Sequence, residues 1–346
     1  MRIGITYNLK TDLQTAWEAS PVEDAAEEFD PPETIEAIQE VFSGEGHEVF
    51  LLGGDLTIVE KIDRLGIEFV FNLTEGFGGR SRESHIPAVL EMMGIAYSGS
   101  DPVGLGVTLD KSLAKRMAVS LGIPTPKYWI LDRHCESVES AKERGGSNEL
   151  PFPLFVKPLC EGSSKGIRRS SRVGDRGTLD KELARLYKDY PEAPVLVEEY
   201  IPGREFTVGV LGNDPPEMMG VMEIAFRDPA QGDFCYSLEV KRNWKEEVDY
   251  HFPAGLERGI RERIEEAALR LFKAFGLRDV ARFDFRVNPQ GRPYFLEANP
   301  LPGLSPESGD LVLLARKKGW SYRELILKIT SAAMSRYPEL NETETR

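Results

Sequence analysis

The sequence predicts a mixed α/β fold that is divided into two or three domains. Its 346 residues exceed the roughly 100–200 residues of a single domain. Hydrophobic residues make up 41% and charged residues 29% of the chain, as in ordinary globular proteins. Strand-like and helix-like segments alternate near the N-terminus, and this order predicts a parallel sheet covered by helices.

The N-terminal segments show the spacing of both element types. Apolar residues at Ile35, Ile38, Val41 and Phe42 recur at helical spacing, and Gly46 ends that segment. The runs around it are rich in β-branched and aromatic residues, which favours strands. We expect strands at 2–7, 49–52 and 67–72, helices at 31–46 and 87–93, and a strand leading into a loop at 96–100.

The middle of the chain begins with one long helix. Leu109, Leu113, Met117 and Leu121 recur every four residues, which predicts a helix over 108–122. We then expect strands at 128–131, 154–157, 195–199 and 206–211, a helix at 178–190, and a charged surface segment at 136–150. Residues 212–252 mix glycine, proline and acids with weak periodicity, which is typical of a lid or a binding loop.

The C-terminal part combines a hairpin with helices. Residues 259–275 form a strongly amphipathic pattern, and 288–291 read as a turn. We expect helices at 259–275, 310–318 and 322–329, strands at 280–287 and 294–299, and a frayed end at 341–346.

The composition excludes several function classes. Asp and Glu number 57 against 43 Lys and Arg, and the net charge of −14 argues against a general nucleic-acid binder. Three cysteines and four histidines form no disulfide framework and no zinc pattern. We expect no signal peptide and no membrane span, and therefore a cytoplasmic protein.

Four polar residues are expected on one face of the C-terminal hairpin. Side chains alternate along a strand, so Arg282 shares a face with Asp284, and Glu297 with Asn299. If residues 290–291 form the centre of the turn, Asp284 pairs with Glu297 and Arg282 with Asn299. Such oxygens suit Mg²⁺ that holds phosphate groups. The alternative is a cross-strand ion pair on a solvated face.

A lysine and a small-residue loop form a second candidate site. Lys157 ends an apolar strand, and Glu161-Gly162-Ser163-Ser164-Lys165-Gly166 follows it. Backbone N–H groups of such a loop can hold phosphates, although the pattern is no Walker A loop. The alternative is a flexible turn. The carboxylates at Glu198, Glu199 and Glu205 could meet an adenine amine and ribose hydroxyls, but surface acids are common.

The order of these segments resembles the ATP-grasp superfamily and, within it, the D-alanine–D-alanine ligase family. The resemblance covers roughly 65–330 and rests on the segments Asp110-Lys111, Lys157-Pro158, 161–164, 203–208, 252–256, 282–284 and 296–299, with Gly303 and Ser308 at the family's spacing. It implies an α/β (α+β) ATP-grasp fold of three domains. These are a parallel N-terminal α/β domain over 1–105 and two mainly antiparallel ATP-grasp subdomains over 106–208 and 209–330, before a tail over 331–346.

The resemblance also implies a role for each matching residue. Nucleotide-binding roles fall to Lys111, Lys157, Glu161, Ser163, Ser164, Glu198, Glu199, Tyr200, Ile201, Glu205 and Lys241. Two Mg²⁺ ions, or Mn²⁺ in their place, would bind Asp284, Glu297 and Asn299. Catalytic roles fall to Arg282, Ser163, Lys241 and Gly303, and substrate contacts to Ser308, Gly303, Glu75 and Arg242.

The implied reaction is the ATP-driven joining of a carboxylate to an amine. The carboxylate attacks the γ-phosphate to form an acyl phosphate, and the amine then attacks the carbonyl through an oxyanion that Arg282 and the Gly303 N–H would stabilise. The partners are thus small amino acids or other carboxylates and amines, with a homodimer expected from the family. Residues 212–252 and 159–166 are candidate lids that exclude water.

The sequence departs from the family where amino-acid ends are recognised. The glycines and the glutamate of the family's N-terminal loop are missing at 7–12, where Asp12 or, further on, Glu18 is a candidate replacement. Glu75 and Glu307 stand where the family has histidine, and Arg242 follows Lys241 where a tyrosine is common.

An altered substrate pair therefore competes with genuine D-alanyl-D-alanine synthesis. The acidic side chains of Glu75 and Glu307, in place of histidine, suit a cationic substrate. A non-catalytic ATP-binding pseudoenzyme or sensor is the alternative of another class, but retention of the metal carboxylates argues against it. A different ATP-grasp reaction, such as carboxylation, is disfavoured by the family-like C-terminal segments.

Overall fold

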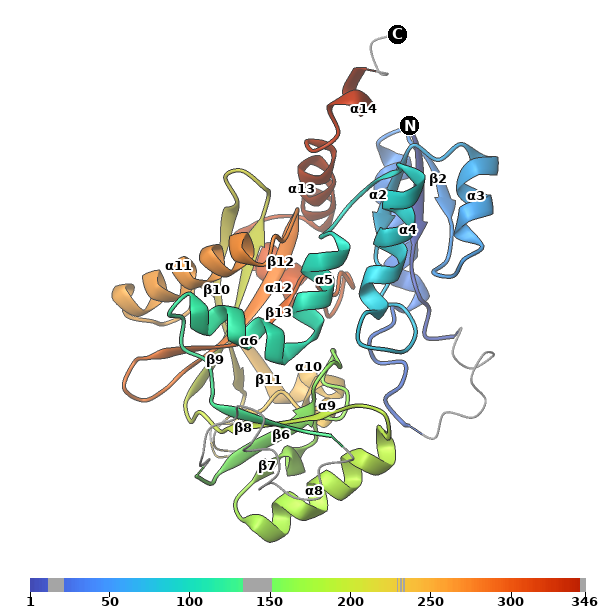
Figure 1. The fold of residues 1–346 in the computed structure, drawn as a ribbon. Helices are drawn as coiled ribbons and strands as arrows, with labels where there is room; N and C mark the ends of the chain where they lie inside the picture. The colour runs from blue at the N-terminus through green and yellow to red at the C-terminus, as the bar shows by residue number, and fades with distance from the viewer. Residues whose placement is uncertain (12–21, 133–150, 229, 231, 233, 343–346) are drawn as a thin grey trace.

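The computed structural model describes residues 1–11, 22–132, 151–228, 230, 232 and 234–342, and these build three sheets around one central region (Figure 1). The N-terminal sheet is parallel, and the other two are antiparallel. This arrangement confirms the predicted mixed fold class. The segment at 136–150, and the candidates Asp12 and Glu18, lie outside the described residues.

The N-terminal sheet has the strand order β2-β1-β3-β4. Its strands are β1 (Arg2–Thr6), β2 (Glu48–Leu51), β3 (Phe69–Asn72) and β4 (Ala96–Tyr97). The accompanying helices are α2 (Pro32–Gly44), α3 (Ile58–Leu65), η1 (Arg82–Ser84) and α4 (His85–Met93). Sequence analysis missed α3, whose eight residues bury only Ile58 and Ile62 and so carry a short apolar pattern.

The helix predicted over 108–122 is two helices, α5 (Pro102–Leu109) and α6 (Lys111–Ser120). Asp110 separates them in an extended conformation, and its side chain accepts hydrogen bonds from the backbone N–H groups of Ser112 and Leu113. Asp110 is therefore an N-cap, because it satisfies donors that the first turn of α6 leaves free. The leucine spacing continues across this break and hid it.

The central sheet has the order β5-β8-β6-β7. Its strands are β5 (Tyr128–Leu131), β6 (Leu154–Pro158), β7 (Arg172–Val173) and β8 (Val195–Glu199), with η2 (Arg169–Ser171) before β7. Helix α8 (Arg176–Asp189) buries Leu179, Leu183 and Leu186 against the apolar face of this sheet. The other face is turned toward the rest of the molecule (Figure 1).

The third sheet has the order β11-β10-β9-β12-β13. Its strands are β9 (Arg204–Leu211), β10 (Glu217–Phe226), β11 (Val248–His251), β12 (Val280–Val287) and β13 (Pro293–Asn299). The C-terminal helices are α9 (Leu238–Arg242), α10 (Trp244–Glu247), α11 (Arg258–Ala274), α12 (Asp310–Lys318), α13 (Tyr322–Met334) and α14 (Pro338–Glu342).

The expectation of an irregular segment over 212–252 is wrong for β10 and β11. The register of β10 shifts between Met218 and Gly220, and Gly220 has a φ of 132°. A Cβ at Gly220 would lie 2.7 Å from the ring of Phe252. This glycine and the prolines before the strand weakened the strand pattern in the sequence.

The structure also changes two of the expected domain limits. A limit at 208 would cut β9, which pairs with β10 and β12, so residues 204–208 belong to the C-terminal sheet. The expected tail from 331 begins inside α13, where Ala333 is fully buried. The N-terminal sheet and the C-terminal helices share one core, in which Ile38 and Phe42 of α2 are clustered with Ile326 and Ile329 of α13.

No helix in the described ranges combines the length and the apolar character that a membrane crossing requires.

Candidate active site

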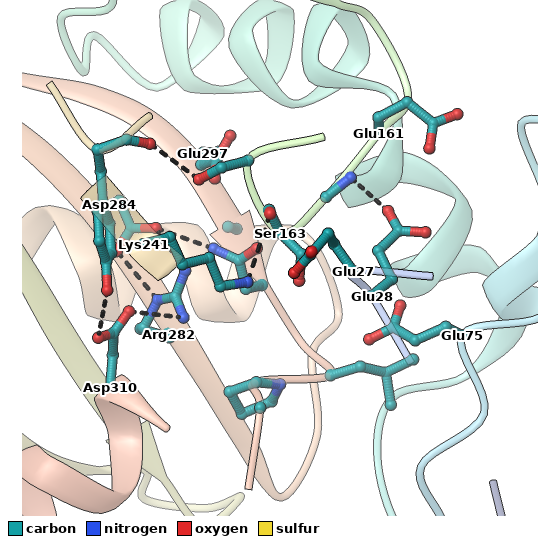
Figure 2. Close-up of a pocket in the computed structure, with 18 of the residues that line it drawn as sticks. Glu27, Glu28, Glu75, Glu161, Ser163, Lys241, Arg282, Asp284, Glu297 and Asp310 are labelled. Carbon is teal, nitrogen blue, oxygen red and sulfur yellow. Dashed lines mark hydrogen bonds and ion pairs between the residues drawn. The ribbon is translucent and has the colours of Figure 1, made fainter. Parts of the chain in front are cut away.

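A cavity of about 510 Å³ lies where the three sheets meet, and every residue to which the family resemblance assigned a nucleotide, metal, catalytic or substrate role lines it. Figure 2 shows part of this lining. The phosphate, adenine, metal, oxyanion and substrate candidates all contribute to its lining, Glu75 and Arg242 included. Figure 2 shows Arg282, Asp284 and Asp310 together on one wall, with Glu28, Glu75 and Glu161 across from them. Residues far apart in the sequence are therefore neighbours in one site.

The β12–β13 hairpin provides the predicted polar face. Arg282 pairs with Asn299, and Asp284 pairs with Glu297, as the sequence pattern predicted. The turn is shifted by one residue, however, because Val287 pairs with Pro293 and the backbone N–H of Asn288 donates to the carbonyl of Arg292. A bulge between Asp284 and Phe285 restores the predicted pairs at the site.

Asp284 is the centre of a dense network. It accepts two hydrogen bonds from the Arg282 guanidinium, at 3.1 and 2.9 Å, and one from the Asn299 amide at 3.0 Å. The Thr207 hydroxyl donates to it from β9 at 2.8 Å. Burial raises the pKa of Asp284, and the charge of Glu297 adds to this while Arg282 opposes it.

The second carboxylate of the hairpin faces a lysine. Glu297 lies 3.6 Å from the Lys111 ammonium at the start of α6. Burial disfavours the charged form of Glu297, but the charges of Lys111 and Lys157 prevail and lower its pKa. Lys111 also donates to the carbonyl of Glu161 at 2.5 Å. The hairpin oxygens thus lie beside basic groups that would meet the same phosphates.

Two buried lysines share one carboxylate on the central sheet. Glu198 on β8 lies 2.9 Å from Lys157 on β6 and 2.8 Å from Lys115 on α6. Against the effect of burial, these two charges lower the pKa of Glu198 to about 2. Sequence analysis missed Lys115, although it follows Lys111 by one helical turn and so shares its side of α6.

Glu205 and Tyr200 are held by another residue that sequence analysis missed. Arg286 donates to Glu205 at 3.1 Å and to the Tyr200 hydroxyl at 3.0 Å. Burial, together with the charges of Asp284 and Glu297, raises the pKa of Glu205 to about 7. The signal for Arg286 was its place two residues after Asp284 on β12.

The Gly/Ser loop has an unusual backbone. Ser163 and Ser164 have φ values of 50° and 60°, in the left-handed region that non-glycine residues seldom adopt. In the described chain their backbone N–H groups have no acceptor. The Lys241 ammonium, from α9, donates to the carbonyl of Ser163 at 3.3 Å. The loop therefore offers free donors toward the cavity, with a lysine beside it.

An acidic strap, defined as residues 22–30, closes against this loop and was not anticipated. The backbone N–H of Gly162 donates to Glu28 at 2.5 Å. Arg82 and Lys165 form ion pairs with Glu28 at 2.7 and 3.1 Å. Despite burial, the charges of Lys165 and Arg82 lower the pKa of Glu28 to about 2. The run of acids between β1 and α2 was the available signal.

Arg242 does not act alone at the cavity wall. It forms ion pairs with Glu23 and Glu27, so α9 is tied to the acidic strap. Glu307 is exposed and pairs with Lys245 at 3.3 Å, outside the cavity lining. The suggestion that Glu307 adds acid to the substrate site is therefore wrong, whereas Glu75 does line the cavity.

Asp310 is a further cavity residue that sequence analysis missed. It lies at the start of α12, 3.5 Å from the Arg282 guanidinium, and accepts from the hydroxyls of Tyr236 and Tyr250 at 3.4 and 3.2 Å. Arg282 thus lies between two carboxylates. Although burial opposes it, the charges of Asp284 and Asp310 raise the pKa of Arg282.

Comparison with known proteins identifies the family. The family model for the D-ala D-ala ligase C-terminus matches residues 117–331. The chain belongs to the D-alanine–D-alanine ligase family. It is 30% identical to a D-alanine–D-alanine ligase of Aquifex aeolicus, over 85% of this chain and 92% of that protein. It is 34% identical to the uncharacterized protein y4sG of Sinorhizobium fredii, over 88% of this chain and 87% of that protein.

The solved structures agree in fold. The D-alanine–D-alanine ligase of Bacillus anthracis, solved in complex with ATP, superimposes with a TM-score of 0.72 at 22% identity. The match covers 98% of this chain and 99% of that one. This member of the D-alanine–D-alanine ligase family is therefore an ATP-grasp ligase in fold and in enzyme class.

Proposed function

We propose that this ligase joins a carboxylate to an amine through an acyl phosphate, using a substrate pair other than two D-alanines. The observation that carries the reaction class is the hairpin face, where Asp284, Glu297 and Asn299 lie beside Arg282 and opposite Lys111. Carboxylates and an amide next to basic groups suit a nucleotide triphosphate with its divalent cation better than they suit a solvated ion pair.

The residues present fit ATP and Mg²⁺. In the described chain no group of three or more acidic, His or Cys side chains could by itself hold a metal ion. Asp284 and Glu297 with the Asn299 amide would therefore hold Mg²⁺, or Mn²⁺, only when phosphate oxygens complete the ligand set. When bound, the ion supplies charge neutralisation at the phosphates.

The chain's own groups then position the nucleotide. Lys111 and Lys157 would contact phosphate oxygens, and the free N–H groups of Ser163 and Ser164 would donate to them. Lys241 lies within reach of the same loop, in agreement with a phosphate contact from a closing segment. Glu198 to Ile201 and Glu205 line the part of the cavity proposed for adenine and ribose.

Two steps then form the new bond. A substrate carboxylate oxygen attacks the γ-phosphorus and releases ADP, which leaves an acyl phosphate. The amine nitrogen attacks the carbonyl carbon, phosphate leaves, and the nitrogen loses a proton. Arg282 and the Gly303 N–H, which has no acceptor in the described residues, would donate to the oxyanion between these events. The strap and α9 exclude water that would hydrolyse the acyl phosphate.

Asp310 argues against D-alanine at both positions. The Arg282 guanidinium already faces Asp284 and Asp310, so its charge does not offset the other acids of the cavity. Glu75, Asp30 and Glu83 add further acid to the same cavity. Each alanine carries its ammonium together with a carboxylate and is neutral overall, so two alanines would leave that surplus of acid unmatched.

The test is phosphate release from MgATP with D-alanine alone, with product masses read from the same reaction. We expect little ADP and no dominant alanyl-alanine mass, and then ADP with a product when other carboxylates and amines are supplied. Efficient formation of a product with the mass of D-alanyl-D-alanine would instead support the alternative that this protein is a genuine D-alanine–D-alanine ligase. ATP binding without ADP release for any substrate pair would favour the alternative of a non-catalytic ATP-binding pseudoenzyme or sensor.

A further inference from the structure

Three carboxylates of the N-terminal domain line the cavity without a partner. Asp30 is the last residue of the acidic strap, Glu75 follows β3, and Glu83 lies in η1. Within the described ranges none of these carboxylates accepts a hydrogen bond or forms an ion pair. Glu83 is only 8% exposed. A buried carboxylate with no partner is costly, so Glu83 calls for a group that the described chain does not supply, and the half-buried Asp30 and Glu75 lie on the same wall.

The neighbouring basic residues are already taken. Arg82 pairs with Glu28 at 2.7 Å and with Glu161 at 3.4 Å. Lys165 pairs with the same two carboxylates at 3.1 and 2.5 Å. These two cations balance two anions. Burial raises the pKa values of Asp30 and Glu83, and the charges of Lys10 and Lys241 oppose this at Asp30 as that of Lys111 does at Glu83, but within the described ranges none of these lysines forms an ion pair with Asp30, Glu75 or Glu83. Acidic side chains therefore outnumber the cations that pair with them on this wall.

A separate observation at the same wall also points to a ligand. Asn72 lines the cavity and is 4% exposed, and its amide Nδ2 has no hydrogen-bond partner. Its Oδ1 is fixed by the Thr6 hydroxyl at 2.8 Å and by the backbone N–H of Thr74 at 3.2 Å. An orphaned donor among acids fits a ligand that has both an acceptor oxygen and cationic nitrogen.

A bare metal ion does not fit this wall. In the parts of the chain that are described, no three acidic, His or Cys side chains converge closely enough to hold one. Figure 2 shows Glu75 pointing toward the middle of the cavity. An extended organic cation can reach several such groups at once, because each protonated nitrogen carries more than one N–H.

We propose that Asp30, Glu75 and Glu83 bind a protonated nitrogen that the substrate carries in addition to its reacting groups, as in a basic amino acid or a polyamine. This inference rests on the proposed function, since the same cavity must hold the reacting carboxylate. A single α-ammonium needs one carboxylate, and the wall offers three. Burial raises the pKa of Glu83 to about 8 and that of Asp30 to about 7, so without a ligand both acids are partly protonated at neutral pH, and a bound cation would favour their charged forms.

The experiment compares each cation with its neutral isostere by titration calorimetry. The protein is loaded with Mg²⁺ and the non-hydrolysable ATP analogue AMP-PNP. Lysine is matched with norleucine and arginine with citrulline, each as L and D forms, and spermidine is added as a polyamine. We expect at least one cation to bind about 10–100-fold more tightly than its isostere, since each tenfold is about 1.4 kcal/mol.

Variants then locate the effect. Glu83→Gln and Glu75→Gln should each weaken binding of the selected cation about tenfold or more and leave the isostere unchanged. Either variant suffices if the other fails to fold. Glu307→Gln, which removes an exposed acid outside the cavity, should change neither affinity. Equal binding of cation and isostere, no binding of any cation, or equal losses in all three variants would overturn the proposal.

A parallel turnover assay separates this inference from the proposed function. ADP release that proceeds only with neutral substrates would keep the ligase reaction and overturn the binding of a cation by the acidic wall. The opposite result is selective binding of lysine or arginine that Glu83→Gln abolishes, without ADP release for any substrate pair. It would support cation binding by the acidic wall and overturn the proposed ligase reaction.

Discussion

At the scale of single residues, the hairpin carboxylates define the proposed metal site most sharply. Asp284→Ala and Glu297→Ala should each abolish Mg²⁺-dependent ATP cleavage, because phosphate oxygens and the remaining ligand cannot complete the coordination. The measurement is ADP formation with circular dichroism as the folding control. Glu223→Ala, which removes a carboxylate outside the cavity on β10, is the matched variant and should retain activity. Wild-type turnover in either hairpin variant would remove the metal assignment.

Lys157 and Lys115 offer a second residue-scale test, because they share Glu198 but only Lys157 lines the cavity. Lys157→Ala should weaken ATP binding about 10–100-fold through loss of a phosphate contact. Lys115→Met should instead lower the free energy of unfolding by roughly 1–3 kcal/mol, because Glu198 loses one hydrogen-bond donor but keeps Lys157, with a smaller change in ATP affinity. Unchanged ATP affinity in Lys157→Ala would contradict its proposed role.

At the scale of elements, the strands and helices near the site were largely predictable. β5, β8, β12 and α12 have the bounds that the sequence pattern predicted, because each is a continuous apolar or amphipathic run between clear turn signals. β10 was missed because a bulge at Gly220 breaks its pattern. The predicted pairing of Asp284 with Glu297 is correct because two deviations from the expected hairpin cancel. The turn is shifted by one residue, and the bulge shifts the pairing back.

Local patterns could not predict which distant segments meet. Glu28 and Asp310 carry no motif, and their importance depends on Arg82 and Lys165 in one case and on Arg282 in the other. Those partners are brought together by the packing of the N-terminal sheet, the Gly/Ser loop and α12. The residues to which the resemblance assigned a binding or catalytic role, in contrast, all line one cavity.

The tie between α9 and the acidic strap gives a prediction at this scale. Arg242→Ala breaks the ion pairs with Glu23 and Glu27 that hold α9 to the strap. We expect more water at the acyl phosphate, so that ADP exceeds ligated product by about threefold or more, with a raised substrate KM. Arg227→Ala, which breaks an exposed ion pair with Asp249, is the control. A ratio of ADP to product near one in Arg242→Ala would show that the tie does not protect the intermediate.

At the scale of the whole molecule, the buried acids set the pH dependence of stability. The pKa values of Glu28 and Glu198 are lowered to about 2, so the stability that they add is present above about pH 4.5 and is lost as pH falls toward 2. Burial raises the pKa values of Asp30 and Glu205 to about 7 and of Glu83 to about 8. Their protonated forms are favoured on folding, so stability is lost as pH rises through these values.

These opposing effects predict a maximum of stability near pH 5 for the ligand-free protein. The free energy of unfolding, measured by denaturant titration between pH 4 and 8, should fall by a few kcal/mol from pH 5 to 8. Burial lowers the pKa of Lys115 to about 8, so its contribution stays nearly constant over most of this range. Glu83→Gln, which mimics the protonated acid, should flatten the decline, while Glu307→Gln should leave it unchanged. A flat profile in the wild type would mean that the acids of the cavity wall are already paired with cations. It would contradict the excess of acidic groups from which the cationic substrate was inferred.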